Sequence, residues 1–248
     1  MLDLHAHLGS FPLPGVTGRA DDLLRLMDRL DTETTCASSA EAIFYDMHAG
    51  NAALARDLRR HHRLRGYVFG NPNHVPASVE EITRWLQEPG FVGVKLYSGG
   101  YVGKPLDCEE HQRILSAVAG RFPWALVLFH CGENDPRNFP GLVRLASEFP
   151  ELTFLAGHMG SKLWRDALPV LSQAPNIVAE ISAPVPARCR IEDAVRWMGA
   201  ERVVFGSDFP LIHPAYMLGC VRDADVSEEA KRLILEGNAR RLLGRAQG

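Results

Sequence analysis

The chain has 248 residues, of which 46% are hydrophobic and 23% charged, and its formal net charge is −3. A chain of this length can bury a substantial core without disulfides, and it suits one α/β barrel or two smaller domains. The nearly balanced charge and the lack of a membrane-length apolar run argue against nucleic acid or a membrane as partner. A basic run from Arg56 to Arg65 falls at a predicted helix end, where cations complement the helix dipole, and is interpreted as solvated surface.

Short apolar runs alternate with longer amphipathic runs along the sequence. Eight of the short runs are dense in Val, Leu, Ile and Phe, which is typical of parallel strands buried on both faces. These predicted strands are Leu2–Ala6, Thr34–Ser38, Leu64–Gly70, Phe91–Tyr97, Ala125–His130, Leu152–His158, Asn176–Ser182 and Arg202–Gly206.

The amphipathic runs between these strands predict helices. Apolar residues recur at helical spacing from Ile191 to Met198, and Ser78 and Glu81 form a capping box at the start of another run. Strand-then-helix units repeated along the chain predict an α/β fold, a single-domain (β/α)8 TIM barrel over residues 1–248. An open doubly wound sheet is the alternative, but the turn after the first strand lacks a glycine-rich phosphate motif.

Five ionisable residues fall at or just after the carboxyl ends of predicted strands: His5, His7, His130, His158 and Asp208. In a parallel barrel these ends meet on one face, where active sites lie. His5 and His7 are two residues apart on one strand, so their side chains point to the same side. A lone strand-end histidine is more often a hydrogen-bonded core residue, but five such residues on one rim predict a functional site. Three histidines and a carboxylate suit zinc or another borderline divalent metal.

Two charged residues, Lys95 and Glu180, interrupt apolar strands, and each needs a partner. We expect Lys95 to bind a substrate anion or to pair with a carboxylate, and a carboxylated Lys95 that bridges two metals is the alternative. For Glu180, pairing with a nearby cation is the simplest expectation. Asp3 has the same parity as His5 and is expected to brace a metal ligand from behind.

The five cysteines are odd in number and widely spaced, which indicates a reducing compartment. Cys131 directly follows His130 and is expected to be a buried thiol rather than a nucleophile. Residues 1–7 contain no secretory signal, so we expect a cytoplasmic protein.

These motifs together resemble the amidohydrolase superfamily, and most of all the amidohydrolase-related branch that includes aminocarboxymuconate semialdehyde decarboxylase. The matching pieces keep the expected strand order across nearly the whole chain. They are Asp3-Leu4-His5-Ala6-His7, Gly93-Val94-Lys95-Leu96-Tyr97, His130, Gly157-His158-Met159-Gly160, Val204 to Pro210 and the tail Gly237 to Gly244. The resemblance implies a divalent metal bound by His5, His7, His130 and Asp208, with His158 catalytic rather than a ligand.

The branch holds hydrolases and decarboxylases, so the resemblance leaves the reaction open. We expect a hydrolase that acts on a small carbonyl compound (an amide, lactone or ester) through a metal-activated water, with one divalent ion, zinc by preference. Asp208 would carry the proton of that water, and His158 would polarise the carbonyl or orient the water. Non-oxidative decarboxylation of a small carboxylic acid is the first alternative. A barrel-type deoxyribonuclease is less favoured, because Lys95 stands near where those enzymes generally carry a glutamate ligand. A non-catalytic binding protein on the same scaffold is the alternative from another class.

Several residues near the predicted strand ends are candidates for contact with a small-molecule substrate. The stronger candidates are Lys95, Tyr97, Arg137 and His213, and the weaker ones are Ser98, Tyr101 and Glu133. Loop position is what favours most of them. A homodimer is the assembly that the resemblance suggests.

Overall fold

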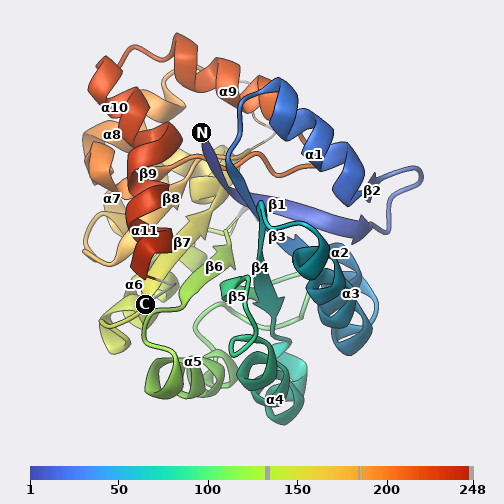
Figure 1. The fold of residues 1–248 in the computed structure, drawn as a ribbon. Helices are drawn as coiled ribbons and strands as arrows, with labels where there is room; N and C mark the ends of the chain where they lie inside the picture. Colours follow the sequence, from blue (N-terminus) through green and yellow to red (C-terminus); the bar gives the residue numbers. More distant parts are fainter. Residues whose placement is uncertain (132–134, 184, 186, 246–248) are drawn as a thin grey trace.

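The computed structural model describes residues 1–131, 135–183, 185 and 187–245. Its centre is a curled sheet of parallel strands inside a ring of helices (Figure 1), with strands in the order β2-β1-β3-β4-β5-β6-β7-β8-β9. The strands are β1 Leu2–Ser10, β2 Thr17–Gly18, β3 Thr34–Ser39, β4 Leu64–Phe69, β5 Phe91–Leu96, β6 Leu126–His130, β7 Thr153–Gly157, β8 Ile177–Glu180 and β9 Val203–Val204. All eight predicted strands are present, which confirms the (β/α)8 barrel class. The antiparallel β2 was not predicted, because two residues are too few to form a pattern.

Helices follow the strands in turn and cover the outer face of the sheet. They are α1 Ala20–Arg29, α2 Ala40–Phe44, α3 Met47–Arg60, α4 Val75–Trp85, α5 Glu109–Arg121, α6 Asn138–Glu148, α7 Trp164–Leu171, α8 Arg190–Met198, α9 Pro214–Asp223, α10 Glu228–Arg232 and α11 Asn238–Arg245. Short 3-10 or π segments lie at Pro72–His74, His158–Leu163, Ala200–Arg202 and Leu233–Gly237. Among the described residues, none of the helices is both long and apolar enough to cross a membrane.

The capping box predicted at Ser78 and Glu81 is wrong, because α4 begins one turn earlier, at Val75, with a proline in its first turn. Ser78 is buried, and its Oγ accepts a hydrogen bond from the N–H of Asn71 at 2.8 Å. Glu81 accepts one from Trp85 Nε1 at 2.8 Å. Ser78 therefore bonds to the turn that precedes α4, and Glu81 bonds within the helix, so the two do not form a capping box.

The seam of the barrel lies between β1 and the segment that follows β9. The N–H of Leu4 donates to the carbonyl of Phe205 at 3.0 Å. The N–H groups of Ser207 and Asp208 both donate to the carbonyl of His5, at 3.1 and 2.7 Å. These bonds join the two edges of the sheet and pair backbone groups that an open edge would expose.

A register shift in β1 between Asp3 and Ala6 changes which side chains face the barrel interior. Leu4 belongs to the inner apolar cluster, whereas Ala6 packs in the outer core under the helices. Side chains alternate along a regular strand, so an unbroken β1 with Leu4 inside would turn the next residue outward. The irregularity allows His5 to face inward just above Leu4.

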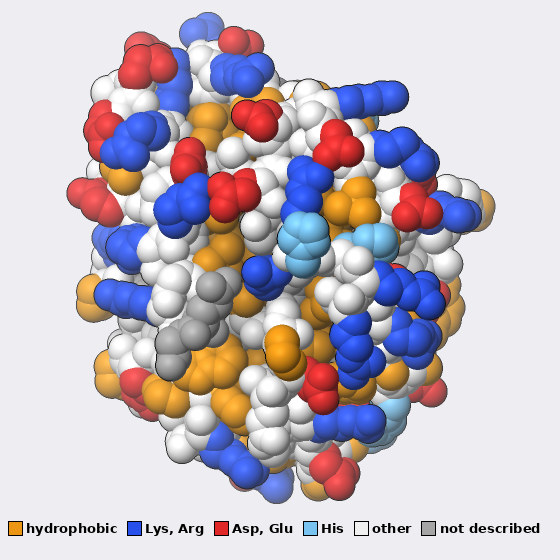
Figure 2. All heavy atoms as spheres, in the orientation of Figure 1, with side chains coloured by type: hydrophobic (Ala, Val, Ile, Leu, Met, Phe, Trp, Pro, Cys, Tyr) orange, Lys and Arg blue, Asp and Glu red, His pale blue; other side chains and the backbone are white. Residues whose placement is uncertain are grey.

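Lys and Arg side chains gather over α3 in Figure 2. Two of the arginines in this basic run are paired, because Arg59 lies 3.4 Å from Glu88 and Arg63 lies 2.5 Å from Asp28. Exposed pairs of this kind contribute little stability. The cluster matches the solvated helix end expected from the sequence.

Helix α11 closes the end of the barrel opposite the strand carboxyl ends, where Ala239, Leu242 and Leu243 pack against the inner apolar cluster. We predict that Leu242→Ala lowers the free energy of unfolding by about 2–5 kcal/mol, because it leaves a cavity in this closure. Denaturant titration measures the change, with the exposed Arg245→Ala as control. Equal stability of the two variants would contradict this account of the closure.

Candidate metal centre and active site

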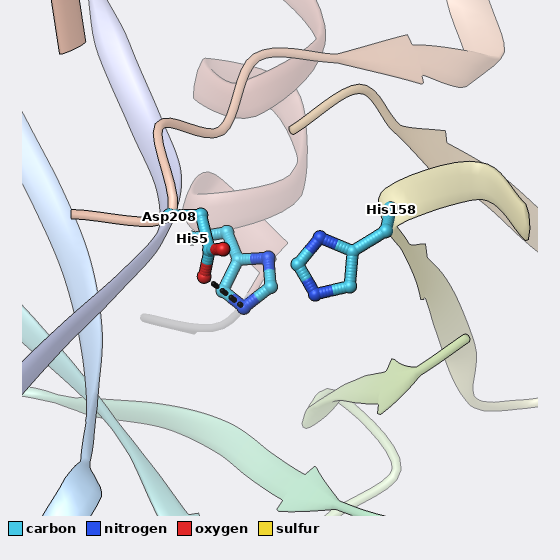
Figure 3. Close-up of side chains that lie close together, drawn as sticks. All are labelled: His5, His158 and Asp208. Carbon is cyan, nitrogen blue, oxygen red and sulfur yellow. Dashed lines mark ion pairs between the residues drawn. The ribbon is translucent and has the colours of Figure 1, made fainter. Parts of the chain in front are cut away.

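The five strand-end residues lie together at the carboxyl end of the barrel. His5 and His7 come from β1, His130 from β6, His158 from the turn after β7, and Asp208 from the segment after β9. His5, His158 and Asp208 each place a donor atom within 4.8 Å of the other two. Figure 3 shows these three side chains pointing toward one another from separate segments of the chain, with His5 Nε2 3.8 Å from Asp208 Oδ1. The barrel thus assembles a possible metal-binding cluster from distant parts of the sequence.

His7 and His130 join this cluster from opposite sides. His7 Nε2 lies 3.3 Å from Asp208 Oδ1, and its other ring nitrogen lies 3.0 Å from Ser38 Oγ. His130 Nδ1 lies 3.2 Å from His158 Nε2. The closest group of three therefore contains His158, the expected catalytic residue, and not His130, an expected ligand.

Asp208 Oδ1 is buried and has no hydrogen-bond donor among the described residues. A buried anionic oxygen without a donor is costly, and a divalent cation beside it would satisfy its charge. Burial raises the pKa of Asp208, but His158, His7 and Lys95 together outweigh that effect and hold it below its usual value. An ionised carboxylate among imidazoles is a donor set that fits zinc or manganese.

The imidazoles are held neutral, which is the form that binds metal. Burial is the main cause in each case. It lowers the pKa of His5 and His130 well below the usual value, lowers that of His7, and lowers that of His158 to about 4.

Lys95 is fully buried, and its Nζ lies 3.0 Å from His5 Nε2. Burial lowers its pKa to about 8, although Asp208 and Glu180 act from farther away in the opposite direction. Within the described ranges Lys95 forms no ion pair, so the carboxylate partner allowed for by the sequence is not in direct contact. Nζ stands beside the metal-facing nitrogen of His5, where it can attract a substrate anion.

Charge balance links the number of bound ions to the chemical state of Lys95. Burial raises the pKa of Asp3 to about 7 and that of Glu180 to about 8, and a bound cation would favour their ionised forms. One divalent ion and the Lys95 ammonium would balance these two carboxylates and Asp208. Two ions would balance them if Lys95 were carboxylated. Both alternatives considered from the sequence are thus electrically consistent.

Two buried carboxylates brace the cluster from behind. Asp3 Oδ1 accepts the main-chain N–H groups of His5 and Ser207, at 3.1 and 3.0 Å, so it holds β1 against the segment after β9. Glu180 Oε2 lies 2.6 Å from His5 Nδ1. The expectation of a cation beside Glu180 is therefore wrong for the described residues, since its partner is a neutral imidazole.

A cavity of about 200 Å³ opens above the cluster, and its walls are mostly aromatic or aliphatic. Its lining consists of Phe11, Pro12, Leu13, Phe44, Tyr97, Tyr101, His130, His158, Asp208 and Leu211. Tyr97 stacks on His130 with ring centroids 4.4 Å apart and planes inclined by 10°. Leu13, Tyr101 and Leu211, which are 50%, 52% and 44% exposed, form an apolar rim. The cavity therefore combines a polar floor with apolar walls.

The structure brings only some of the expected substrate contacts to this cavity. Tyr97 and Tyr101 line it, but Lys95, Arg137 and His213 do not. The Arg137 side chain is 89% exposed and pairs with Asp135, and His213 Nδ1 accepts the N–H of Ala215 at the start of α9. Ser98 is fully buried. Glu133 lies outside the described residues.

The sequence argument missed the apolar cavity walls, such as Phe11, Phe44 and Leu211. These residues follow strand ends or lie on rim loops, and nothing local distinguishes them from core residues. Only their position after strand ends could have indicated them, because the loops at this end of a barrel form its active site.

The chain belongs to the amidohydrolase family, whose model matches residues 3–245. It is also similar to an L-fucono-1,5-lactonase from Burkholderia ambifaria, at 27% identity over 42% of this chain and 46% of the lactonase. The match thus spans less than half the length of that relative.

Solved structures of decarboxylases share the fold. A dihydroxybenzoic acid decarboxylase from Polaromonas, with bound manganese and the inhibitor 2-nitroresorcinol, is 18% identical with a TM-score of 0.79, over 98% of this chain and 96% of that one. A 5-carboxyvanillate decarboxylase from Sphingomonas paucimobilis is 15% identical with a TM-score of 0.75, over 98% of both chains. At such identities the likeness shows the fold alone.

We predict that elemental analysis of protein purified without chelator finds about one divalent ion per chain, because Lys95 contacts His5 Nε2 as an unmodified amine, and one ion beside its ammonium form balances the buried carboxylates. Added bicarbonate, which would promote carboxylation of Lys95, should leave this ratio unchanged. A ratio near two with a carboxylated Lys95 would contradict the mononuclear centre. Failure to bind any divalent ion after reconstitution would contradict both versions.

Proposed function

We propose that the protein is a metal-dependent, non-oxidative decarboxylase of a small aromatic carboxylic acid. The observation that carries this proposal is the cavity, whose apolar walls rise from a floor of His130, His158 and Asp208. Pockets for drug-sized ligands hold about 300–1,000 Å³, so a cavity of about 200 Å³ suits a single ring. The fold shared with aromatic-acid decarboxylases supports the same choice over the hydrolase expected first from the sequence.

We assign the metal to His5, His7, His130 and Asp208, with His158 outside the ligand set. Zinc, the ion expected from the sequence, and manganese both suit nitrogen and carboxylate donors. When bound, the ion would act as a Lewis acid toward substrate oxygens. The apolar walls would hold the ring by its faces, and Lys95 would attract the substrate carboxylate toward the floor.

Asp208 moves the proton in the reaction that we propose. As the substrate binds, the hydroxyl beside its carboxylate donates a hydrogen bond to His158 Nε2, and its proton then passes to the ionised Asp208. Asp208 then passes the proton to the ring carbon that bears the carboxylate. The bond to the carboxylate breaks, its electron pair returns to the ring, and CO2 leaves. The product phenolate takes a proton from water.

Hydrolysis of a small lactone or ester is the second candidate, and the lactonase relative favours it. Asp208 would then accept a proton from the attacking water and His158 would orient the carbonyl. The cavity has few polar groups on its walls, so a polyhydroxylated sugar lactone would leave hydroxyls unpaired. An apolar lactone suits the cavity better.

We expect the metal-loaded protein to release CO2 from hydroxybenzoic acids, while sugar lactones and simple amides stay intact. Aryl esters and apolar lactones complete the panel, and benzoic acid without a hydroxyl is the matched control for the proton source. Release of CO2 is followed in a coupled assay. Turnover of the lactones with no CO2 from any acid would contradict the decarboxylase and favour the second candidate.

We expect substitutions of Asp208 and His158 to have different effects on metal binding and on turnover. Asp208→Asn should weaken metal binding and remove the proton carrier, whereas His158→Asn should keep the metal and lower kcat by about 100- to 10,000-fold. Metal content is measured beside turnover. His213→Asn is the control, because asparagine also caps a helix and residue 213 lies outside the cavity lining. Loss of the metal from His158→Asn would make His158 a ligand and refute this division of roles.

A further inference from the structure

Glu180 lies at the end of β8, fully buried, and polar groups contact its carboxylate from several sides. Oε1 accepts the main-chain N–H of Ser182 at 2.5 Å. Oε2 accepts the main-chain N–H of His158 at 3.1 Å and the hydroxyl of Ser182 at 2.8 Å. Three donors thus converge on the two oxygens, and hydrogen bonds to a carboxylate favour its ionised form, which can only accept.

The geometry around His5 fixes which ring nitrogen carries its proton. His5 Nδ1 lies 2.6 Å from Glu180 Oε2, so Nδ1 donates. In a neutral imidazole the other nitrogen then keeps its lone pair. On that side Lys95 Nζ lies 3.0 Å from His5 Nε2, a distance at which the lysine can donate to it. An acceptor on one side and a donor on the other therefore select the same tautomer.

Ser182, two residues after Glu180, constrains the tautomer of His158 in the same way. Its Nδ1 lies 2.9 Å from the carbonyl oxygen of Ser182 and 3.1 Å from Ser182 Oγ. A carbonyl can only accept, so Nδ1 carries the proton here too. The lone pair of His158 Nε2 then faces the cluster, 3.2 Å from His130 Nδ1.

We propose that Glu180 and Ser182 are positioning residues that fix His5 and His158 as Nδ1–H tautomers, so that both present the Nε2 lone pair to the centre. The opposite tautomer would point an N–H at the ion or at a substrate hydroxyl and could neither ligate the one nor accept from the other. The inference rests on the metal centre of the proposed function, but not on the identity of its substrate.

Gly206 provides an independent sign of this arrangement. A Cβ atom at this position would meet the Glu180 carboxylate and would lie 2.8 Å from His5 Cβ. Gly206 is not among the glycines with positive φ, so space rather than backbone conformation requires it. The glycine in the segment from Val204 to Pro210 thus leaves room for the contact between Glu180 and His5.

The tautomers can be read directly by NMR of metal-free protein labelled with ¹⁵N-histidine, through the couplings between ring nitrogens and carbon-bound protons. We expect Nδ1–H forms for His5 and His158 in the wild type. Glu180→Gln puts an NH2 group among donors, so we expect it to shift the His5 signals toward the Nε2–H form. Competition with a chelator should show metal affinity lowered by about 10- to 100-fold.

Glu81→Gln is the matched control, since Glu81 is also a buried carboxylate, held by His48, Asn51 and Trp85 away from the cluster. It should change neither the His5 signals nor the metal affinity. Ser182→Ala keeps the carboxylate and the main-chain contacts, so it is a milder variant should Glu180→Gln not fold. We expect it to lower metal affinity by less than Glu180→Gln, with His5 still in its Nδ1–H form.

Two results would overturn the inference. The first is an Nε2–H form of His5 or His158 in the wild type, a measurement that needs no variant. The second is a folded Glu180→Gln that keeps the wild-type tautomers and metal affinity. Neither readout uses a substrate, so inactivity toward every acid would contradict the proposed decarboxylase and leave this inference standing. A chain that binds no metal would refute the metal centre itself.

Discussion

The hydrogen-bonded seam between β1 and residues 205–209 is the constraint on which both barrel and site depend. The carbonyl of His5 accepts from Ser207 and Asp208, and Asp3 ties the two segments together through its carboxylate. The same bonds that close the sheet place Asp208 against His5 and His7. Asp208 has a positive φ of 59°, so the backbone departs from the extended conformation at this residue. The hydrogen bonds that close the barrel therefore also position the residues of the candidate metal centre.

Burial of charge gives the centre its chemical character. Lys95 and Glu180 are fully buried and Asp208 nearly so, above an apolar cluster that fills the lower part of the barrel. Removing such groups from water costs several kcal/mol each unless partners offset it. Burial lowers the pKa of His5 and His158, so these imidazoles are neutral. Asp208 Oδ1 has no hydrogen-bond donor among the described residues, and a cation beside it would balance its charge.

The fold was predictable because parallel strands buried on both faces form dense apolar runs that need no knowledge of tertiary structure. The strand-end histidines followed from the same argument, since a barrel brings all strand ends to one rim. The start of α4 was misplaced because Ser78 and Glu81 have the spacing of a capping box, whereas Ser78 bonds to Asn71 in the turn before the helix. The partners of Glu180 and the cavity wall at Phe44 depend on packing between distant loops, which no local pattern encodes.

The most direct test of the central claim is anomalous diffraction from crystals of the metal-loaded protein, recorded at the absorption edge of the ion. We expect a single anomalous peak at the carboxyl end of the barrel, from an ion that Asp208 and imidazole nitrogens of the strand-end histidines ligate at about 2.0–2.2 Å if it is zinc. A peak that lies elsewhere on the protein, or one at this rim that Asp208 does not ligate, would contradict this claim.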